Sequence, residues 1–365
     1  MKTIPVRLGE RSYPVAITDS YRQLPRWLTP LKLSGQGWVI SHPRLLARYG
    51  ADLLGPLRRN GWVLKTLTIP ESETSKSLAV AERLLRMLAR ASSMRVPALF
   101  AFGGGVVGDV TGFVAAVFRR GVPYIQVPTT LLAQVDSAIG GKVGVDLPQG
   151  KNLVGAFYQP RLVYNNVRLL QTLPARQRRS GLAEVIKYGV IADAALFAYL
   201  EAHLDECLAL EPRAVRVMVE RSCAIKARVV SRDERETTGL RAQLNFGHTL
   251  GHALEAVTRY TRWTHGEAIA IGMCAAADLS WRLGLCSRRD FERMVRLIHS
   301  SGLPTNARGL SLHAVLRALQ HDKKFIHGRQ RWVLPRVIGR VVVTEEVPVA
   351  LVRRVLERYV QSARS

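Results

Sequence analysis

The chain has 365 residues, of which 47% are hydrophobic and 22% charged, a composition typical of a folded protein large enough for two domains. No run of ~18 uncharged apolar residues occurs, and the N-terminal residues lack the apolar stretch of a signal peptide, so neither a membrane span nor export is expected. The net charge of +25 comes from 43 arginines and 10 lysines scattered without a basic block, which does not favour a nucleic-acid-binding protein.

Residues 1–171 alternate between strand and helix patterns. Apolar runs at residues 37–41 and 98–102 end at polar or glycine positions, as buried parallel strands do. Residues 78–88 carry apolar side chains at helical spacing, and residues 124–128 are a further strand candidate. This alternation predicts a doubly wound, Rossmann-like α/β domain.

A glycine loop, Gly-Gly-Gly-Val-Val-Gly at residues 103–108, follows one of these strand candidates and precedes a helical stretch. It satisfies G-x-G-x-x-G and predicts a phosphate at a helix N-terminus, although glycine-rich turns are common. No acid lies ~20 residues further on, where a dinucleotide fingerprint has one. The riboses would then be bound elsewhere, for which Glu73 and Lys76 are candidates; the alternative is a helix N-terminal acid and a solvated lysine.

Two neighbouring segments, residues 136–142 and 150–155, each combine glycine with lysine. Lys142, Lys151 and Asn152 could converge on a phosphate, with glycines allowing the backbone to approach it. The alternative is a pair of surface turns. No Walker motif is present, which argues against an ATP-hydrolysing P-loop.

Strand signals fade after residue 171, and helical patterns such as residues 193–208 and 212–230 predict a mainly α-helical second domain over residues 172–365. A short β-like piece follows at residues 331–335 and 339–343. The four cysteines, Cys207, Cys223, Cys274 and Cys286, form no C-x-x-C pair and predict reduced thiols in a cytoplasmic protein.

Within the second domain, Glu184 and Lys187 stand three apart on one helical face in an apolar neighbourhood. A buried ion pair adds little stability, so we interpret them as a metal-binding carboxylate and a lysine that faces an anionic substrate. His248 and His252 are four apart on one helical face, and His265 follows. Glu184, His248 and His265 would form a zinc site with an open position, leaving His252 for substrate contact or proton transfer.

Glycines at positions 247 and 251 run beside these histidines, one helical turn apart. Glycine costs a helix roughly 1 kcal/mol relative to alanine. Two of them suggest that something approaches this backbone closely.

Seven segments in order, together spanning nearly the whole chain, resemble the 3-dehydroquinate synthase family: residues 8–13, 101–113, 126–132, 150–160, 180–189, 244–252 and 322–324. The resemblance implies an NAD- and zinc-dependent cyclase, with cobalt as a possible metal and an active site in the cleft between the two domains. Such a lyase converts 3-deoxy-D-arabino-heptulosonate 7-phosphate into 3-dehydroquinate and phosphate in the shikimate pathway of aromatic amino acid biosynthesis. NAD is reduced and reoxidised within the cycle.

The resemblance also assigns residues to roles. The metal ligands would be Glu184, His248 and His265. Phosphate-binding positions are matched by Lys142, Asn152, Lys187 and His252, and Arg120 matches one that reaches the neighbouring subunit of a homodimer. Lys226, Arg241, Lys323 and Lys324 match positions near the substrate carboxylate, with Asp136 and Asn245 near its hydroxyls. NAD contacts are expected from Gly104, Gly105, Val106, Asp109, Thr129, Thr130, Lys151 and Thr172, together with Glu73 and Lys76.

Some positions depart from the family pattern. His42 stands where an Asp or Asn is frequent, Asn166, Arg168 and Gln177 stand where acids are frequent, and the turn at residues 236–239 is one residue longer. None of these touches the metal set or the phosphate lysines.

Other functions remain open at this point. A related sugar-phosphate cyclase that makes a cyclitol would share the zinc and NAD positions, but the four cations assigned to the carboxylate favour a carboxylated substrate. A metal-dependent polyol dehydrogenase would not need the phosphate lysines. A nucleic-acid-binding protein would show no zinc dependence and would lose binding steeply with salt.

Overall fold

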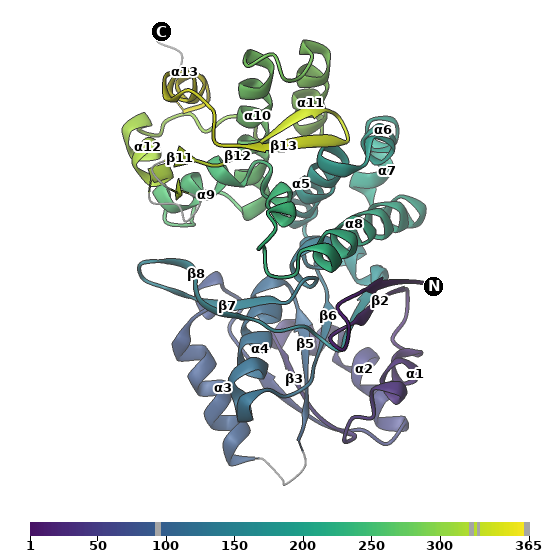
Figure 1. Cartoon of the computed structure of the whole chain (residues 1–365). Coiled ribbons are helices and arrows are strands. Elements are labelled where there is room, and N and C mark those ends of the chain that lie inside the picture. Colours follow the sequence, from purple (N-terminus) through teal and green to yellow (C-terminus); the bar gives the residue numbers. More distant parts are fainter. Residues whose placement is uncertain (92–95, 321–324, 327–328, 361–365) are drawn as a thin grey trace. The chain divides into compact units, whose positions relative to one another are not determined.

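The computed structural model describes residues 1–91, 96–320, 325–326 and 329–360. The chain forms two compact units, Met1–Leu173 with Lys226–Arg235, and Pro174–Ile225 with Glu236–Ser365 (Figure 1). Helix α8 (Pro212–Arg232) is therefore divided between the units, whereas the sequence analysis expected one uninterrupted second domain. Among the described residues, no helix combines the length and apolarity that crossing a membrane requires.

The first unit is built on a seven-stranded sheet. In spatial order its strands are β1 (Lys2–Val6), β2 (Tyr13–Thr18), β9 (Leu162–Asn166), β6 (Tyr124–Pro128), β5 (Ala98–Gly103), β3 (Gln36–Ser41) and β4 (Val63–Thr68). All neighbouring pairs are parallel except β1 with β2. The predicted doubly wound α/β architecture is confirmed.

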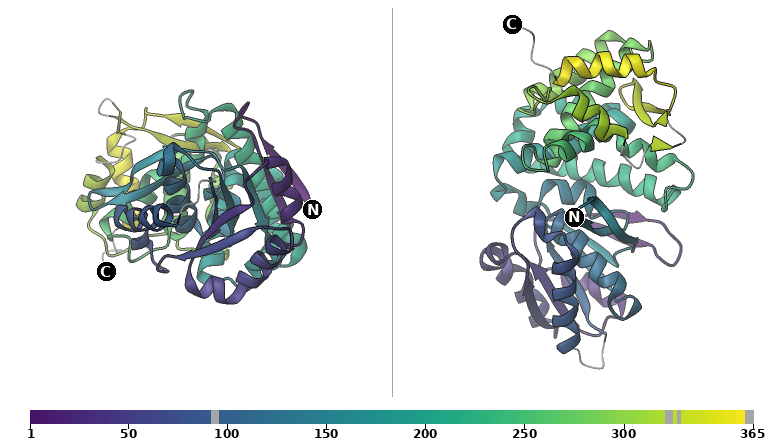
Figure 2. Two further views of the ribbon diagram at one scale, coloured as in Figure 1. Left: turned by 90° about the horizontal axis from the view of Figure 1, so that it is seen from below. Right: turned by 90° about the vertical axis from the view of Figure 1, so that its left-hand side faces the viewer.

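Helices cover both faces of this sheet (Figure 1 and Figure 2). Side chains alternate across β5, so that Leu99 belongs to one hydrophobic cluster and Phe100 to the other. The Leu99 cluster includes Leu84 of α3 (Leu78–Arg90) and Val114 of α4 (Gly105–Val117). The Phe100 cluster includes residues of α1 (Leu24–Leu28) and α2 (Pro43–Arg59). Burial on both faces explains why β5 is apolar at every position.

The strand order places a topological switch point between β3 and β5. From β3 the chain proceeds outward to β4, then returns to β5 on the other side of β3 and continues to β6 and β9. Ligands of doubly wound sheets bind beyond the carboxyl ends of the strands at such a point. The glycine loop follows β5 directly, and the Ser41 hydroxyl at the end of β3 donates to the Phe102 carbonyl of β5 (2.6 Å).

Shorter elements complete the first unit. They are the helical turns η1 (Thr29–Leu31), η2 (Glu73–Ser75), η3 (Phe118–Arg120), η4 (Ala133–Ser137) and η5 (Val167–Thr172), and the hairpin of β7 (Lys142–Leu147) and β8 (Gly150–Phe157). The five residues of η4 are a π-helical turn, a form that is frequent at functional sites.

The second unit is mainly helical, as predicted. Its helices are α5 (Ala175–Ala192), α6 (Ala194–Ala202), α7 (Leu204–Ala209), η6 (Leu240–Asn245), α9 (His248–Val257), α10 (His265–Arg282), α11 (Arg288–Ser300), α12 (Leu312–Gln320) and α13 (Val349–Val360), besides its part of α8. Strands β10 (Phe325–Ile326), β11 (Arg329–Gln330), β12 (Trp332–Val337) and β13 (Arg340–Thr344) form two small hairpins, the second of which is the predicted late β piece. The helix expected over residues 193–208 is broken at His203 between α6 and α7.

Helix α10 is the centre of this unit. It is buried along most of its length and packs against α5, α9, α11, α13 and β12. The approach of α9 to α10 is so close that a Cβ atom on Gly272 would overlap the carbonyl oxygen of Gly247, and one on Gly251 would lie 2.6 Å from Cδ1 of Ile269. The glycines noted beside the histidines therefore allow a neighbouring helix, rather than a ligand, to approach the backbone.

Candidate active site

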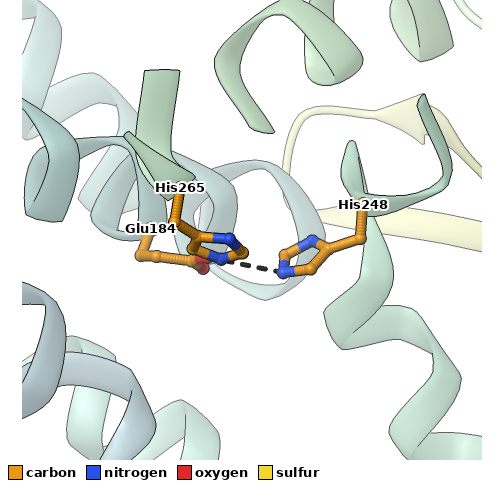
Figure 3. Close-up of side chains that lie close together, drawn as sticks. All are labelled: Glu184, His248 and His265. Atoms are coloured by element: carbon orange, nitrogen blue, oxygen red, sulfur yellow. Dashed lines mark ion pairs between the residues drawn. The ribbon is translucent and has the colours of Figure 1, made fainter. Parts of the chain in front are cut away.

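Three side chains from three helices of the second unit form a candidate metal centre. Glu184 lies in the middle of α5, His248 is the first residue of α9, and His265 is the first residue of α10 (Figure 3). The Nε2 atoms of His248 and His265 lie 3.5 and 3.3 Å from Oε1 of Glu184. Ligands on a tetrahedral zinc ion at ~2.1 Å are about 3.4 Å apart, so these spacings suit one ion.

The surroundings of Glu184 also fit a metal. Its side chain is fully buried, and within the described part of the chain neither carboxylate oxygen has a hydrogen-bond partner of ordinary geometry. The Lys187 ammonium, itself 1% exposed, is in ion-pair contact with Oε2. A buried carboxylate with so few partners is costly, and a divalent ion would provide the missing coordination.

Both histidines direct the same nitrogen toward Glu184. The Nδ1 of His248 lies 3.1 Å from the Phe246 carbonyl oxygen, and the Nδ1 of His265 lies 3.4 Å from Oε2 of Glu255. Burial lowers the pKa of His265, but the carboxylates of Glu255 and Glu184 outweigh it and raise that pKa to about 10. In the metal-free chain a proton is therefore held on this imidazole, and an incoming metal must displace it.

The start of α10 is fixed by a capping box that the sequence analysis missed. The Thr264 hydroxyl accepts from the Glu267 backbone N–H (3.4 Å), and Glu267 accepts from the Thr264 N–H (2.7 Å). Arg176 of α5 donates two hydrogen bonds to Glu267, of 2.8 and 2.7 Å. The helices that carry Glu184 and His265 are thus tied together two residues from His265 and about two turns from Glu184. The signal was present in the sequence as Thr-x-x-Glu before an apolar run.

The remaining predicted residues of the second unit lie on α9 and η6. The His252 ring centroid is 5.3 Å from that of His248 and 6.1 Å from that of His265. Arg241, which is buried, and Asn245 are in the turn that leads into His248. Lys323 and Lys324 lie outside the described residues.

In the first unit, the predicted cofactor residues gather at the ends of β5 and β6. Gly104 is the N-cap of α4, and Gly105 and Val106 form its first turn. Thr129 and Thr130 follow β6, and the Thr129 N–H donates to the Gly103 carbonyl (3.0 Å). A Cβ on Gly104 would lie 3.1 Å from Cγ2 of Thr130, so the two loops are in close contact. The helix N-terminus at this edge suits a phosphate.

Four of the predicted cofactor residues form two ion pairs. Lys76 Nζ lies 2.6 Å from Oδ2 of Asp109 on α4, and Lys151 Nζ lies 2.9 Å from Oε1 of Glu73 on η2. Burial lowers the pKa of Lys76, but Asp109 outweighs it and raises that pKa above the usual value, so the lysine stays charged. Thr172 is placed at the end of η5, where its hydroxyl contacts that of Tyr49.

The other predicted residues of the first unit are more dispersed. Asp136 lies in η4 and pairs with Lys226, whose Nζ is 2.9 Å from its Oδ1. Lys142 and Asn152 are on the β7–β8 hairpin, and Asn152 has the positive φ of 55° that its turn requires. Arg120 follows α4 in a turn where it and Arg119 both have positive φ. The structure places these residues but leaves their roles as predictions.

Comparisons with known proteins bear on what this site does. Residues 66–180 match a family model described as 3-dehydroquinate synthase N-terminal, and residues 181–325 match one described as 3-dehydroquinate synthase C-terminal. The chain is also 46% identical to a 3-dehydroquinate synthase from Picosynechococcus sp., over 97% of this chain and 98% of that protein.

The chain belongs to the 3-dehydroquinate synthase family. The resemblance seen in the sequence motifs is confirmed, and with it membership in a class of lyases.

Two solved structures are similar to this 3-dehydroquinate synthase family member throughout. One is 2-epi-5-epi-valiolone synthase from Streptomyces hygroscopicus subsp. jinggangensis 5008 with NAD⁺ and Zn²⁺ bound, with a TM-score of 0.88, 27% identity and coverage of 96% of this chain and 98% of that one. The other is 2-deoxy-scyllo-inosose synthase complexed with carbaglucose-6-phosphate, NAD⁺ and Co²⁺, with a TM-score of 0.87, 27% identity and coverage of 98% of this chain and 100% of that one. Both are complexes with the two kinds of cofactor predicted from the sequence.

Proposed function

We propose that this chain is an NAD- and zinc-dependent 3-dehydroquinate synthase that converts 3-deoxy-D-arabino-heptulosonate 7-phosphate into 3-dehydroquinate and phosphate. The observation that carries the proposal is the Glu184–His248–His265 cluster beside Lys187, in a chain that matches both halves of this family. In this reading the chain acts in the shikimate pathway of aromatic amino acid biosynthesis.

The chemistry divides between the cofactors and the chain's own side chains. Bound NAD would take and return a hydride, and zinc or cobalt on the Glu184 cluster would act as a Lewis acid toward a substrate hydroxyl. Lys187 would hold an anionic group next to the metal ligands, because its ammonium is already buried there. His252, one turn from His248, is placed to contact the substrate or to move a proton.

A cyclitol-forming cyclase is the second candidate, because the two solved structures described above are a 2-epi-5-epi-valiolone synthase and a 2-deoxy-scyllo-inosose synthase. Two buried cations, Arg241 and Lys226, favour a substrate with a carboxylate instead. Arg241 is 3% exposed and Lys226 is 6% exposed, and the resemblance assigns both to the substrate carboxylate.

The proposal is tested by measuring phosphate release from the heptulosonate phosphate with NAD present, before and after chelation and zinc add-back. We expect release that stops with chelator, returns with zinc and produces no net NADH. Lys187→Met should abolish release, whereas the exposed Lys65→Met is its matched control and should not. No release by protein that carries both zinc and NAD would contradict the proposal. The next substrate to test would then be a sugar phosphate without a carboxylate.

We infer further that the chain works as a homodimer in the cytoplasm. All four cysteines are free and buried, which suits a reducing compartment. The turn with two successive arginines at positive φ would present Arg120 to a neighbouring subunit. Mixing an Arg120→Ala protein with a Lys187→Met protein tests this arrangement, because mixed dimers should regain part of the activity that both parents lack. A monomer in sedimentation would refute it.

A further inference from the structure

A second buried carboxylate faces the metal centre from outside the predicted ligand set. Glu255 lies on α9, seven residues after His248 and three after His252, and is only 3% exposed. Its Oε2 lies 3.4 Å from Nδ1 of His265, while the Nε2 of the same ring lies 3.3 Å from Glu184. The His265 imidazole therefore stands between two carboxylates, with one at each nitrogen.

This arrangement specifies how the ring can bind a metal. A neutral imidazole has one N–H group and one lone pair. If Nδ1–H donates to Glu255, the lone pair is on Nε2 and is directed at the Glu184 cluster. His248 follows the same pattern with a weaker acceptor, because its Nδ1 faces the neutral Phe246 carbonyl at 3.1 Å. Of these two histidines, His265 is the one whose Nδ1 faces a carboxylate, that of Glu255.

The packing of α9 on α10 holds the pair in place. The close approach at Gly251, where a Cβ would lie 3.2 Å from the Ala268 carbonyl oxygen, is one helical turn from Glu255 on α9. Ala268 is one turn from His265 on α10. The same contact that brings the two helices together therefore sets the separation of carboxylate and imidazole.

We propose that Glu255 is a positioning residue of the metal centre: it accepts the Nδ1–H of His265, fixes its tautomer and strengthens its Nε2 as a ligand. The proposal rests on the metal-dependent function proposed above. Outer carboxylates of this kind typically change metal affinity by about 10- to 100-fold.

Glu255 could instead be a ligand itself, since His252, Glu255 and His265 also bring ligand atoms within 4.8 Å of one another. An ion there would use the Nδ1 of His265 and leave the fully buried Glu184 carboxylate without it. The fully buried Glu184, with the Nε2 atoms of His248 and His265 3.5 and 3.3 Å from its Oε1, favours the outer role for Glu255.

The test is zinc affinity, measured by competition with a chromophoric chelator, and the visible spectrum of the cobalt-substituted protein. We expect Glu255→Gln to weaken zinc binding about 10- to 100-fold and to retain the cobalt band pattern of an unchanged ligand set. The matched control is Asp278→Asn, which neutralises another buried carboxylate, on α10, and should not alter zinc affinity.

Zinc affinity of Glu255→Gln equal to that of the wild type would overturn the inference, and so would a cobalt spectrum that reports a lost ligand. Wild-type protein that binds no zinc would overturn the metal centre itself, together with the proposed function. Nitrogen-15 NMR of the zinc-loaded wild type provides a test that needs no variant. We expect a protonated Nδ1 and a metal-bound Nε2 on His265, and the opposite assignment would refute the proposal.

Discussion

The closest helix contact of the second unit supports a quantitative prediction for Gly272→Ala. The new Cβ would overlap the Gly247 carbonyl oxygen and lie 2.9 Å from its carbonyl carbon and 3.0 Å from the Gly251 nitrogen. Non-bonded heavy atoms in ordinary contact are about 3.5–4.0 Å apart, so the overlap with the Gly247 oxygen requires the helices to separate by more than about 1 Å. All three opposing atoms are backbone, and no side-chain rotation can relieve the overlap.

The cost follows from two opposing effects. Alanine gains about 1 kcal/mol over glycine in a helix interior, while overpacking costs about 1–3 kcal/mol and reaches or exceeds the upper end where backbone meets backbone. We expect a net loss of about 2 kcal/mol, or about 4–8 °C in the melting midpoint for a unit of this size. Because metal ligands tolerate shifts of only about 0.2 Å, moving α9 from α10 should also weaken zinc binding at least about tenfold.

The assay compares thermal unfolding in chelator with zinc affinity by chelator competition. Gly50→Ala in α2 is the control, because its Cβ would meet only the Leu46 side chain at 3.7 and 3.8 Å. That variant should melt at or slightly above the wild-type temperature and bind zinc normally. A Gly272→Ala protein that melts no lower than wild type would refute the packing argument. A destabilised one with full zinc affinity would refute the link between helix separation and the ligands.

Three further predictions concern charged groups. Burial raises the pKa of Glu267, but Arg176 and the Thr264 cap outweigh it and lower that pKa below the usual value. The ionised Glu267 therefore contributes its full stabilisation above its unfolded pKa of about 4.3, and this contribution is lost as the pH falls through its folded pKa. Glu267→Gln should reduce the dependence of the melting temperature on pH in the acid range. An unchanged dependence would argue against the ion pair between Arg176 and Glu267. Chelation should lower the melting midpoint of the wild type and of Lys187→Met, because both bind zinc, but not that of His265→Ala. The zinc content of each protein is measured in parallel. Full zinc occupancy in His265→Ala would remove His265 from the ligand set. Asp109→Asn should lower the free energy of unfolding by about 3–5 kcal/mol, because it removes the carboxylate that pairs with the buried Lys76. The double variant Asp109→Leu with Lys76→Met should recover this stability but not NAD binding, both measured by calorimetry. Retained NAD affinity in the double variant would show that this ion pair does not contribute to cofactor binding.

Those parts of this fold that depend on the local spacing of residues could be predicted from the sequence. Continuous apolar runs predicted buried parallel strands, and the loop at residues 103–108 falls at the switch point between β3 and β5. The i,i+4 spacing of His248 and His252 placed both on one face of α9. Glu184 stood out because a carboxylate in an otherwise apolar helix needs a partner.

Other features depended on contacts between distant segments and could not be predicted. The assignment of Lys226–Arg235 to the first unit follows from tertiary packing, which places the boundary between the units within the continuous helix α8. The partner of Gly251 was visible only once α10 was placed against α9. Glu255 carried a usable signal, seven residues after His248 on the same face, but its role depends on where His265 lies.

Under the proposed function, the contact between Lys187 and Glu184 would link metal loading to anion binding. In the metal-free chain the two charges offset one another. A divalent ion bound to Glu184 would weaken this pairing and so favour an anionic group of the substrate beside Lys187. By reciprocity, whatever factor the metal adds to anion affinity, the anion adds to metal affinity. Cells short of zinc would therefore retain the ion best in enzyme molecules that already hold substrate.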